Sequence, residues 1–168
     1  MDNNKVIVIE NTANAVVSLT VPNTNVSRTW SQRGAKATLP FGDLEQAYYT
    51  QGGGYLFNNG ILYIEDLEAK IALGLEEEKE DGDVEGKPSL KIKKYVDADF
   101  DKLMNDAPMK PFKEELEKMS PEQRRTFADY AIEHEISNYN KAKVIKELVG
   151  VDVIAIIEEN NSEAPSAE

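Results

Sequence analysis

The stretch Glu76–Leu90, EEEKEDGDVEGKPSL, divides this chain into two parts with different sequence patterns. It contains seven acidic residues, two lysines, two glycines and a proline, but only two aliphatic side chains. Such a composition buries too little apolar surface to offset the conformational entropy lost on ordering. We therefore predict that residues 76–90 form a flexible acidic linker between a domain at 1–75 and a domain at 91–159, with a disordered tail at 160–168.

Before this stretch, apolar residues alternate with polar ones or form short β-branched runs, which favours strands. The strands expected from this pattern cover residues 5–10, 15–21, 26–30, 36–39 and 61–64. Only residues 11–14 separate the first two strands, and this is a common length for a hairpin loop. We therefore expect those two strands to pair with each other.

Two short helices are expected in the same half, at residues 44–50 with Asp43 as the N-cap and at 65–73. The side chains expected to face inward from the second helix are Leu67, Ile71 and Leu75. The run Gly52–Gly54 is interpreted as a flexible connector that ends the first helix, with a close approach of the backbone at an interface as the alternative. Residues 55–59 fit either a strand or one helical turn.

After the acidic stretch, apolar residues recur at helical spacing. The helices expected there cover residues 99–105, 112–119, 121–135, 141–149 and 153–159, and residues 90–96 fit a strand or a lead-in. The clearest start signal is Ser120-Pro121-Glu122-Gln123, a capping box with proline at the first helical position. The predicted fold class is α+β, with a small β-rich N-terminal domain of short strands and one or two short helices, the linker, and a small all-helical C-terminal domain.

Composition limits the classes of partner. The net charge of −12, from 31 acidic and 19 basic residues, argues against nucleic acid and against an anionic membrane. The absence of cysteine excludes disulfides, thiolate chemistry and cysteine-based zinc sites. The first residues lack the pattern of a signal peptide, and no apolar run is long enough to span a bilayer. The expected location is the cytoplasm of the producing cell, where a virion protein would also be made.

Most titratable clusters are interpreted as structural. The single histidine, His134, lies between two glutamates on a predicted helix, where adjacent side chains diverge. The run Asp97–Asp101, DADFD, lacks the glycine and the glutamate that a calcium loop needs further along. Glu65, Asp66 and Glu68 favour a solvated helix start. We therefore expect no catalytic residue, no cofactor and no metal ion.

One basic and aromatic cluster is a candidate partner interface. Arg28, Arg33 and Lys36 surround Trp30 along the chain, and such a group can bind an acidic partner, a base or a phosphate. The preferred alternative is that Trp30 covers the small β core while the basic side chains stay solvated. If the cluster is functional, the charge of the chain favours a protein partner over nucleic acid.

The N-terminal half resembles a known group of proteins. Val26–Leu39, VSRTWSQRGAKATL, followed by Leu44–Ala47 and by Tyr55–Glu76, YLFNNGILYIEDLEAKIALGLE, resembles uncharacterised proteins encoded in structural gene clusters of tailed bacteriophages (Caudoviricetes). The pieces that carry the resemblance are Arg28–Trp30, Gly60–Leu62 and Leu73–Leu75. The group has no established catalytic residues to transfer to this chain.

A second stretch, Ser120–Glu158, resembles the small helix–extended loop–helix modules that also occur in phage proteins. Some of these modules bind nucleic acid. Lys141, Lys143 and Lys146 put positive charge on one of the predicted helices. Residues 120–160 nevertheless hold eight acidic against five basic residues, and this balance opposes that role.

Together these features predict a non-enzymatic structural or accessory protein of a tailed-phage virion, in the head, neck or tail assembly, made in the host bacterial cytoplasm. Its expected partners are other virion structural proteins, which bind its two linked modules in a multi-copy assembly. An alternative is a soluble intracellular adaptor whose C-terminal helices contact protein or nucleic acid, and a third is an enzyme with an unrecognised acidic site. The linker interpretation predicts that proteases cut first within 76–90 and leave two folded pieces.

Overall fold

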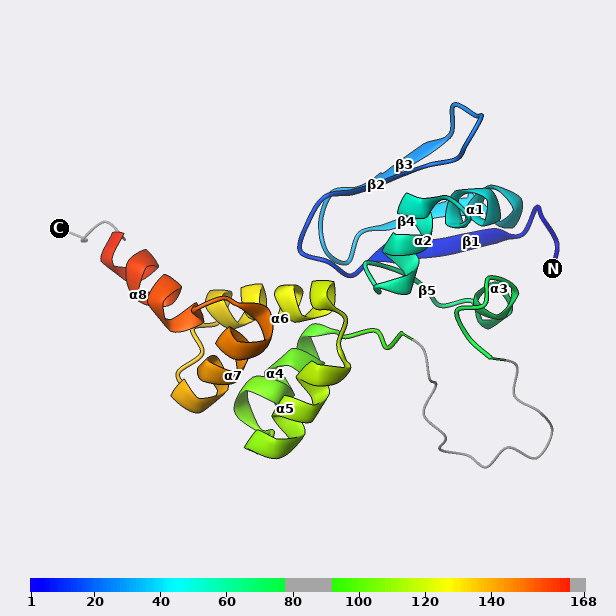
Figure 1. Ribbon diagram of the computed structural model, residues 1–168. Coiled ribbons are helices and arrows are strands. Elements are labelled where there is room, and N and C mark those ends of the chain that lie inside the picture. The colour runs from blue at the N-terminus through cyan, green and yellow to red at the C-terminus, as the bar shows by residue number, and fades with distance from the viewer. Residues whose placement is uncertain (78–91, 164–168) are drawn as a thin grey trace, which may run out of the picture. The chain divides into compact units, whose positions relative to one another are not determined.

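A computed structural model of the chain describes residues 1–77 and 92–163. The chain divides into two compact units, Met1–Lys94 and Tyr95–Glu168, which we call the first and the second unit (Figure 1). The strands lie in the first unit and the second unit is helical, so the predicted α+β class is confirmed. Most of the predicted linker, from residue 78 onward, lies outside the described residues.

The strands of the first unit form two small antiparallel sheets. β1 (Val6–Asn11) is the central strand of a three-stranded sheet, with β4 (Lys36–Pro40) on one side and β5 (Leu62–Ile64) on the other. β2 (Val17–Thr20) and β3 (Ser27–Trp30) form a separate two-stranded ribbon. The strands expected from the sequence are all present, and their ends agree with the predicted ends to within two residues.

The predicted pairing of the first two strands is wrong. β1 pairs with β4 and β5, while β2 pairs with β3. The buried side chain of Asn11 donates from its amide nitrogen to the carbonyl oxygens of Ala15 at 2.7 Å and Gln32 at 3.2 Å. The next residue, Thr12, donates its backbone N–H to the Ile61 carbonyl at 2.9 Å. These bonds hold the chain after β1 in the larger sheet and prevent it from folding back as a hairpin.

Three helices follow in the first unit: α1 (Phe41–Tyr48), α2 (Gln51–Asn58) and α3 (Leu67–Ala72). α1 begins directly after β4, so Asp43 lies in its first turn and is not the N-cap that the sequence predicted. The glycine run lies inside α2, so the predicted connector is wrong. Residues 55–58, where strand and helix were both open, belong to the same helix.

Gly53 is needed in α2 because the backbone of α1 lies close to it, and Thr50 caps the start of this glycine-rich helix. The Thr50 hydroxyl caps α2 by accepting the Gly53 N–H at 2.9 Å. A Cβ at position 53 would lie 1.8 Å from the carbonyl oxygen of Ala47 in α1. The backbone does approach closely at Gly53, but it approaches α1 within the first unit, whereas the alternative interpretation placed the approach at an interface.

The inward face predicted for α3 is partly wrong. Leu67 is 57% exposed, whereas Ala69, Leu73 and Leu75 are buried. α3 is a short helix that begins after its N-cap, Asp66, and Leu73 and Leu75 lie beyond its end. The turn there passes through Gly74, which has a φ of +71°. The helical spacing used for the prediction therefore does not extend to Leu73 and Leu75, which reach the core from beyond the end of the helix.

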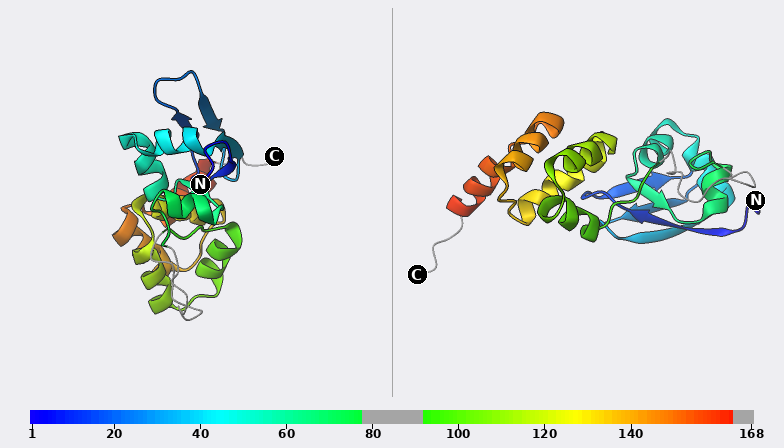
Figure 2. Two further views of the ribbon diagram at one scale, coloured as in Figure 1. Left: turned by 90° about the vertical axis from the view of Figure 1, so that its right-hand side faces the viewer. Right: turned by 90° about the horizontal axis from the view of Figure 1, so that it is seen from below.

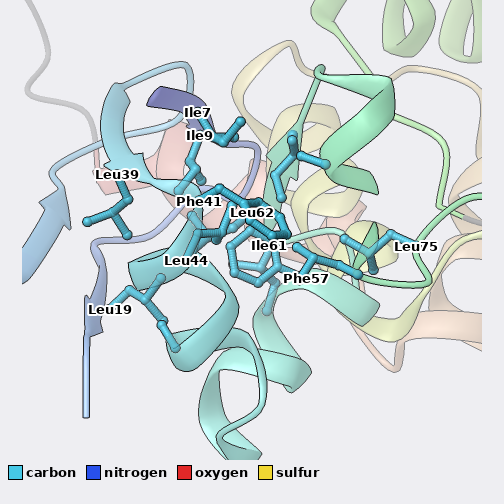
Figure 3. Packing of buried hydrophobic residues seen from close by; sticks show 14 of the residues in the cluster. Ile7, Ile9, Leu19, Leu39, Phe41, Leu44, Phe57, Ile61, Leu62 and Leu75 are labelled. Carbon is cyan, nitrogen blue, oxygen red and sulfur yellow. The ribbon is translucent and has the colours of Figure 1, made fainter. Parts of the chain in front are cut away.

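One core unites the elements of the first unit. It contains buried side chains from both sheets and from α1 and α2. Figure 3 shows Ile9, Leu44, Phe57 and Leu62 among the side chains that converge between the sheet and the helices. Because they share this core, the β2–β3 ribbon and the helices α1 and α2 are parts of one folded unit.

The helices of the second unit are α4 (Asp97–Asn105), α5 (Met109–Lys118), α6 (Pro121–Glu133), α7 (Tyr139–Val149) and α8 (Val153–Glu163). Their core is aromatic, since the ring centroid of Phe100 lies 5.3 Å from those of both Phe127 and Tyr130. The buried side chains of α4, of α5 and of the residue that follows α5 are Phe100, Leu103, Met104, Phe112, Leu116 and Met119.

The boundaries of these helices follow their capping residues. Ser120 accepts the Gln123 N–H at 3.2 Å and donates its own N–H to the Gln123 side chain at 3.0 Å, so the predicted capping box is confirmed. α8 continues to Glu163, so the predicted disordered tail is wrong for residues 160–163, and 164–168 lie outside the described residues. The last apolar residue of α8 is Ile157, and its residues from Glu158 onward are exposed. This exposed end of α8 projects from the other helices of its unit (Figures 1 and 2).

Along the chain, the boundary between the two units lies between Lys94 and Tyr95. Ile92 packs against the core of the first unit, and the Lys94 ammonium lies 2.7 Å from Glu10 and 3.3 Å from Glu65. Burial opposes the charge of Lys94, but hydrogen bonds to these two carboxylates raise its pKa above the ordinary value. Tyr95 belongs to the core of the second unit. The described residues on both sides of 78–91 thus belong to the first unit.

This anchoring gives a stability prediction for the fragment 1–94. Replacing Ile92 and Lys94 together by serine is expected to lower its free energy of unfolding by about 1–2 kcal/mol, because a half-buried aliphatic side chain and a partly buried ion pair are lost. Urea denaturation of the two fragments of equal length measures the difference. Equal midpoints would show that residues 92–94 do not hold to the first unit.

Candidate protein-binding surface

Trp30, the aromatic member of the predicted interface, is a core residue. Its side chain is 1% exposed, and the indole Nε1 donates to the carbonyl oxygen of Ile9 at 2.9 Å. This bond attaches the end of β3 to β1, which lies in the other sheet. The preferred interpretation, in which Trp30 covers the β core, is therefore confirmed for this residue.

The three basic members of the predicted interface lie in different surroundings. Arg28 donates from Nε to the Thr38 carbonyl at 3.0 Å and thereby bridges β3 to β4. Lys36 lies on the three-stranded sheet, with its ammonium 3.6 Å from Glu10. Arg33 is half-buried and lies in the loop that connects β3 to β4. The structure does not join these side chains to Trp30 in one surface, and a binding role for them stays a prediction.

The ribbon carries a polar face that the sequence interpretation missed. Ser18 and Thr20 of β2 lie opposite Thr29 and Ser27 of β3, and all four residues are exposed. The hydroxyl oxygens of Ser18 and Thr29 are 2.9 Å apart, and those of Thr20 and Ser27 are 3.4 Å apart. The available signal was the hydroxyl residue at every second position of both strands. The four side chains of this face are uncharged, and each has a hydroxyl group that can form hydrogen bonds.

Two exposed tyrosines lie near the junction of α1 and α2: Tyr49 is the C-cap of α1, and Tyr55 lies in the middle of α2. Tyr49 is 69% exposed and Tyr55 is 50% exposed. Tyr48 supports the first of them, since their ring centroids are 5.3 Å apart, and its hydroxyl hydrogen-bonds to the Asn58 side chain at 3.3 Å. Tyrosine is enriched in protein-binding surfaces because a rigid, amphipathic ring gives contact area at low entropic cost.

The second unit has a shallow groove between α7 and α8. Its volume is about 440 Å³. The residues that line it are Tyr139, Ala142, Lys143, Lys146, Asp152, Ile154, Ala155 and Glu158. Tyr139 is 69% exposed at its rim. The Lys146 ammonium lies 2.7 Å from Asp152 and, together with the Ala155 N–H, holds the pKa of that carboxyl below its ordinary value. The groove thus combines an exposed ring with three aliphatic and four charged side chains.

Lys141 does not add charge to this surface, contrary to the sequence interpretation. Its side chain is buried, and its ammonium donates to the carbonyl oxygens of Leu103 at 2.7 Å and Met104 at 2.8 Å. Burial lowers the pKa of Lys141, and the nearby Asp106 partly offsets this effect. The lysine satisfies carbonyls at the C-terminal end of α4, which is a structural role.

The remaining titratable candidates also have structural partners. His134 is the C-cap of α6, with its ring centroid 4.0 Å from that of Tyr130. Asp99 accepts the Val96 N–H at 2.9 Å at the start of α4, and Asp101 accepts the Tyr130 hydroxyl at 2.5 Å. In residues 1–77 and 92–163, no three Asp, Glu or His side chains gather where they could hold a metal ion.

Two of the acidic residues at the start of α3 are paired with a lysine. The Lys5 ammonium lies 2.8 Å from both Asp66 and Glu68. Its hydrogen bond, with that of the Ala69 N–H, lowers the pKa of Asp66. The third member, Glu65, contacts Lys94 as described above. These carboxylates therefore serve as helix-capping and ion-pair groups.

Comparisons with protein-family models, with curated proteins and with solved structures find no match to this chain. Among the described residues, none of the helices has the length and apolar character needed to span a membrane.

Proposed function

We propose that this protein is a non-enzymatic structural or accessory component of a tailed-phage particle, and that it binds neighbouring particle proteins through its two units. The segments that resemble phage structural-cluster proteins contribute β3 and β4, part of α1, and the run from α2 through β5 to α3. All of these elements belong to the first unit. The resemblance therefore concerns one folded core, and this supports its use as a guide to function.

The observation that carries the proposal is the exposure of tyrosines on rigid elements of both units. Tyr49 and Tyr139 are each 69% exposed, the first at the corner of α1 and α2 and the second beside the α7–α8 groove. Each unit has its own hydrophobic core, so each presents its tyrosine from a fixed framework. Two contacts within one chain bind more tightly than either alone, because the second contact forms within the same complex.

Particle sedimentation tests the proposal. Particles purified from a producing culture are expected to contain the protein after a high-salt wash. In a chain with Tyr49→Ser and Tyr139→Ser, we expect particle binding to weaken about 30-fold, as for a well-packed interface tyrosine. A Val6→Thr chain is the control, because Val6 is also exposed, at 62%, on the larger sheet.

Two results would contradict the proposal. The first is recovery of the protein only in the soluble fraction. The second is binding to nucleic acid that weakens steeply with salt, which would favour the adaptor function instead.

A further inference from the structure

β2 has one open edge, on the side away from β3. In the ribbon, the Val21 N–H donates to the Val26 carbonyl at 2.9 Å, which makes these two residues a hydrogen-bonded pair. Hydrogen bonding alternates along an antiparallel ladder, so the N–H and C=O groups of Ser18 and Thr20 point away from β3. Both residues are exposed, and their backbone groups bond to no other described element.

The residues of this edge carry neither the charges nor the prolines that often prevent strand addition. Natural edges are blocked by charged side chains, prolines, bulges or extreme shortness. The edge of β4 follows this rule, because Arg28 donates to the outward-facing Thr38 carbonyl and Pro40 ends the strand. β5 is only three residues long. β2 is also short and Pro22 lies just beyond it, but none of its own four residues is charged or a proline, and Val16 just before it is 68% exposed.

The charge distribution indicates which strand can approach. The chain carries a net charge of −12, so two copies repel each other over most of their surface. The seventeen residues 11–27, which include β2, contain no charged side chain. Figure 1 and the left view of Figure 2 show that the hairpin end of the ribbon projects from the rest of the first unit. Two copies can therefore meet along β2 without placing like charges opposite each other.

The side-chain pattern of β2 also fits its own copy. Val17 and Leu19 face the core, whereas Ser18 and Thr20 form the exposed polar face. In an antiparallel β2–β2 pair, the polar faces lie on one side and the apolar faces on the other. We infer that β2 of one copy pairs with β2 of a second copy, so that two ribbons join into a four-stranded sheet.

This inference deepens the proposed function, since it rests on a multi-copy particle. A strand pair of four residues covers far less than the roughly 1,200–2,000 Å² that stable complexes bury. The contact is therefore weak in dilute solution and forms at the high local concentration of an assembly. Its role is to set the spacing of adjacent copies.

Because the chain contains no cysteine, disulfide trapping tests the pair directly. We expect Ser18→Cys, Thr20→Cys or their equimolar mixture to form a disulfide-linked dimer under mild oxidation, since facing residues of paired strands come close enough for a disulfide. Thr29→Cys is the control, because Thr29 lies on the same polar face but away from the edge. It should give at least tenfold less dimer, and equal yields would overturn the inference.

A second measurement avoids redox chemistry and separates this inference from the proposed function. At the high protein concentrations where this weak contact forms, Ser18→Lys is expected to abolish the concentration-dependent self-association that sedimentation equilibrium detects, whereas Thr29→Lys leaves it unchanged. Equal self-association of the two variants would count against β2 pairing. A protein found in particles without trapped dimers would contradict only the pairing, and trapped dimers of a protein absent from particles would contradict only the proposed function.

Discussion

Replacing Gly53 by alanine is expected to destabilise the first unit by about 3 kcal/mol or more, at or above the upper end of the usual cost of overpacking. The new Cβ would lie 1.8 Å from the carbonyl oxygen and 2.7 Å from the carbonyl carbon of Ala47. Both are backbone atoms, so no flexible side chain can move aside. α1 and α2 must separate, and the packing of Leu44 against Phe57 is lost with them.

Gly52, the neighbouring glycine, provides a matched control, because alanine there is expected to raise the stability of the first unit and not to lower it. A Cβ at Gly52 meets no atom within 4 Å, and alanine in a helix is favoured over glycine by roughly 0.5–1 kcal/mol. Gly52→Ala is therefore expected to stabilise the same unit slightly. The single tryptophan, Trp30, is buried in that unit, so its fluorescence during urea denaturation reports on the first unit alone. A Gly53→Ala chain as stable as wild type would show that α1 and α2 do not approach so closely.

The second large effect is expected for Trp30→Ala, at about 3–5 kcal/mol for truncating a buried aromatic side chain. The change also removes the indole hydrogen bond to Ile9 that joins the ribbon to the larger sheet. Thermal unfolding followed by circular dichroism measures the loss. The second unit has a separate core and should unfold at an unchanged temperature.

The same change separates a core role of Trp30 from an interface role. Lys36→Ala is the comparison, because this residue belongs to the predicted interface but its side chain is 55% exposed. It should change stability by less than about 1 kcal/mol. A Trp30→Ala chain that keeps wild-type stability but loses particle binding would place Trp30 at an interface and contradict the described burial.

Local patterns in the sequence predicted the elements better than their pairing. Alternation located the strands, and the Ser120 capping box located the start of α6. The pairing of β1 depends on the Asn11 amide, whose partners Ala15 and Gln32 lie four and 21 residues further along the chain. No local pattern contains that information.

The misassigned residues share one physical cause, which is tertiary contact. Glycine disfavours helices, yet Gly53 is required in α2 because α1 passes so close to it. Lys141 resembles a surface lysine in sequence, but its acceptors are backbone carbonyls 38 and 37 residues earlier. For the candidate surface, the burial of Trp30 followed from its place beside a small β core. The open edge of β2 became apparent only once its pairing with β3 was known.

The absence of any spacer between Lys94 and Tyr95 has a mechanical consequence for a protein held at both units. Tension between the units acts first on Ile92 and Lys94, the last residues anchored to the first unit. The Lys94 ion pairs to Glu10 and Glu65 therefore resist any force that the second unit transmits along the chain to the first.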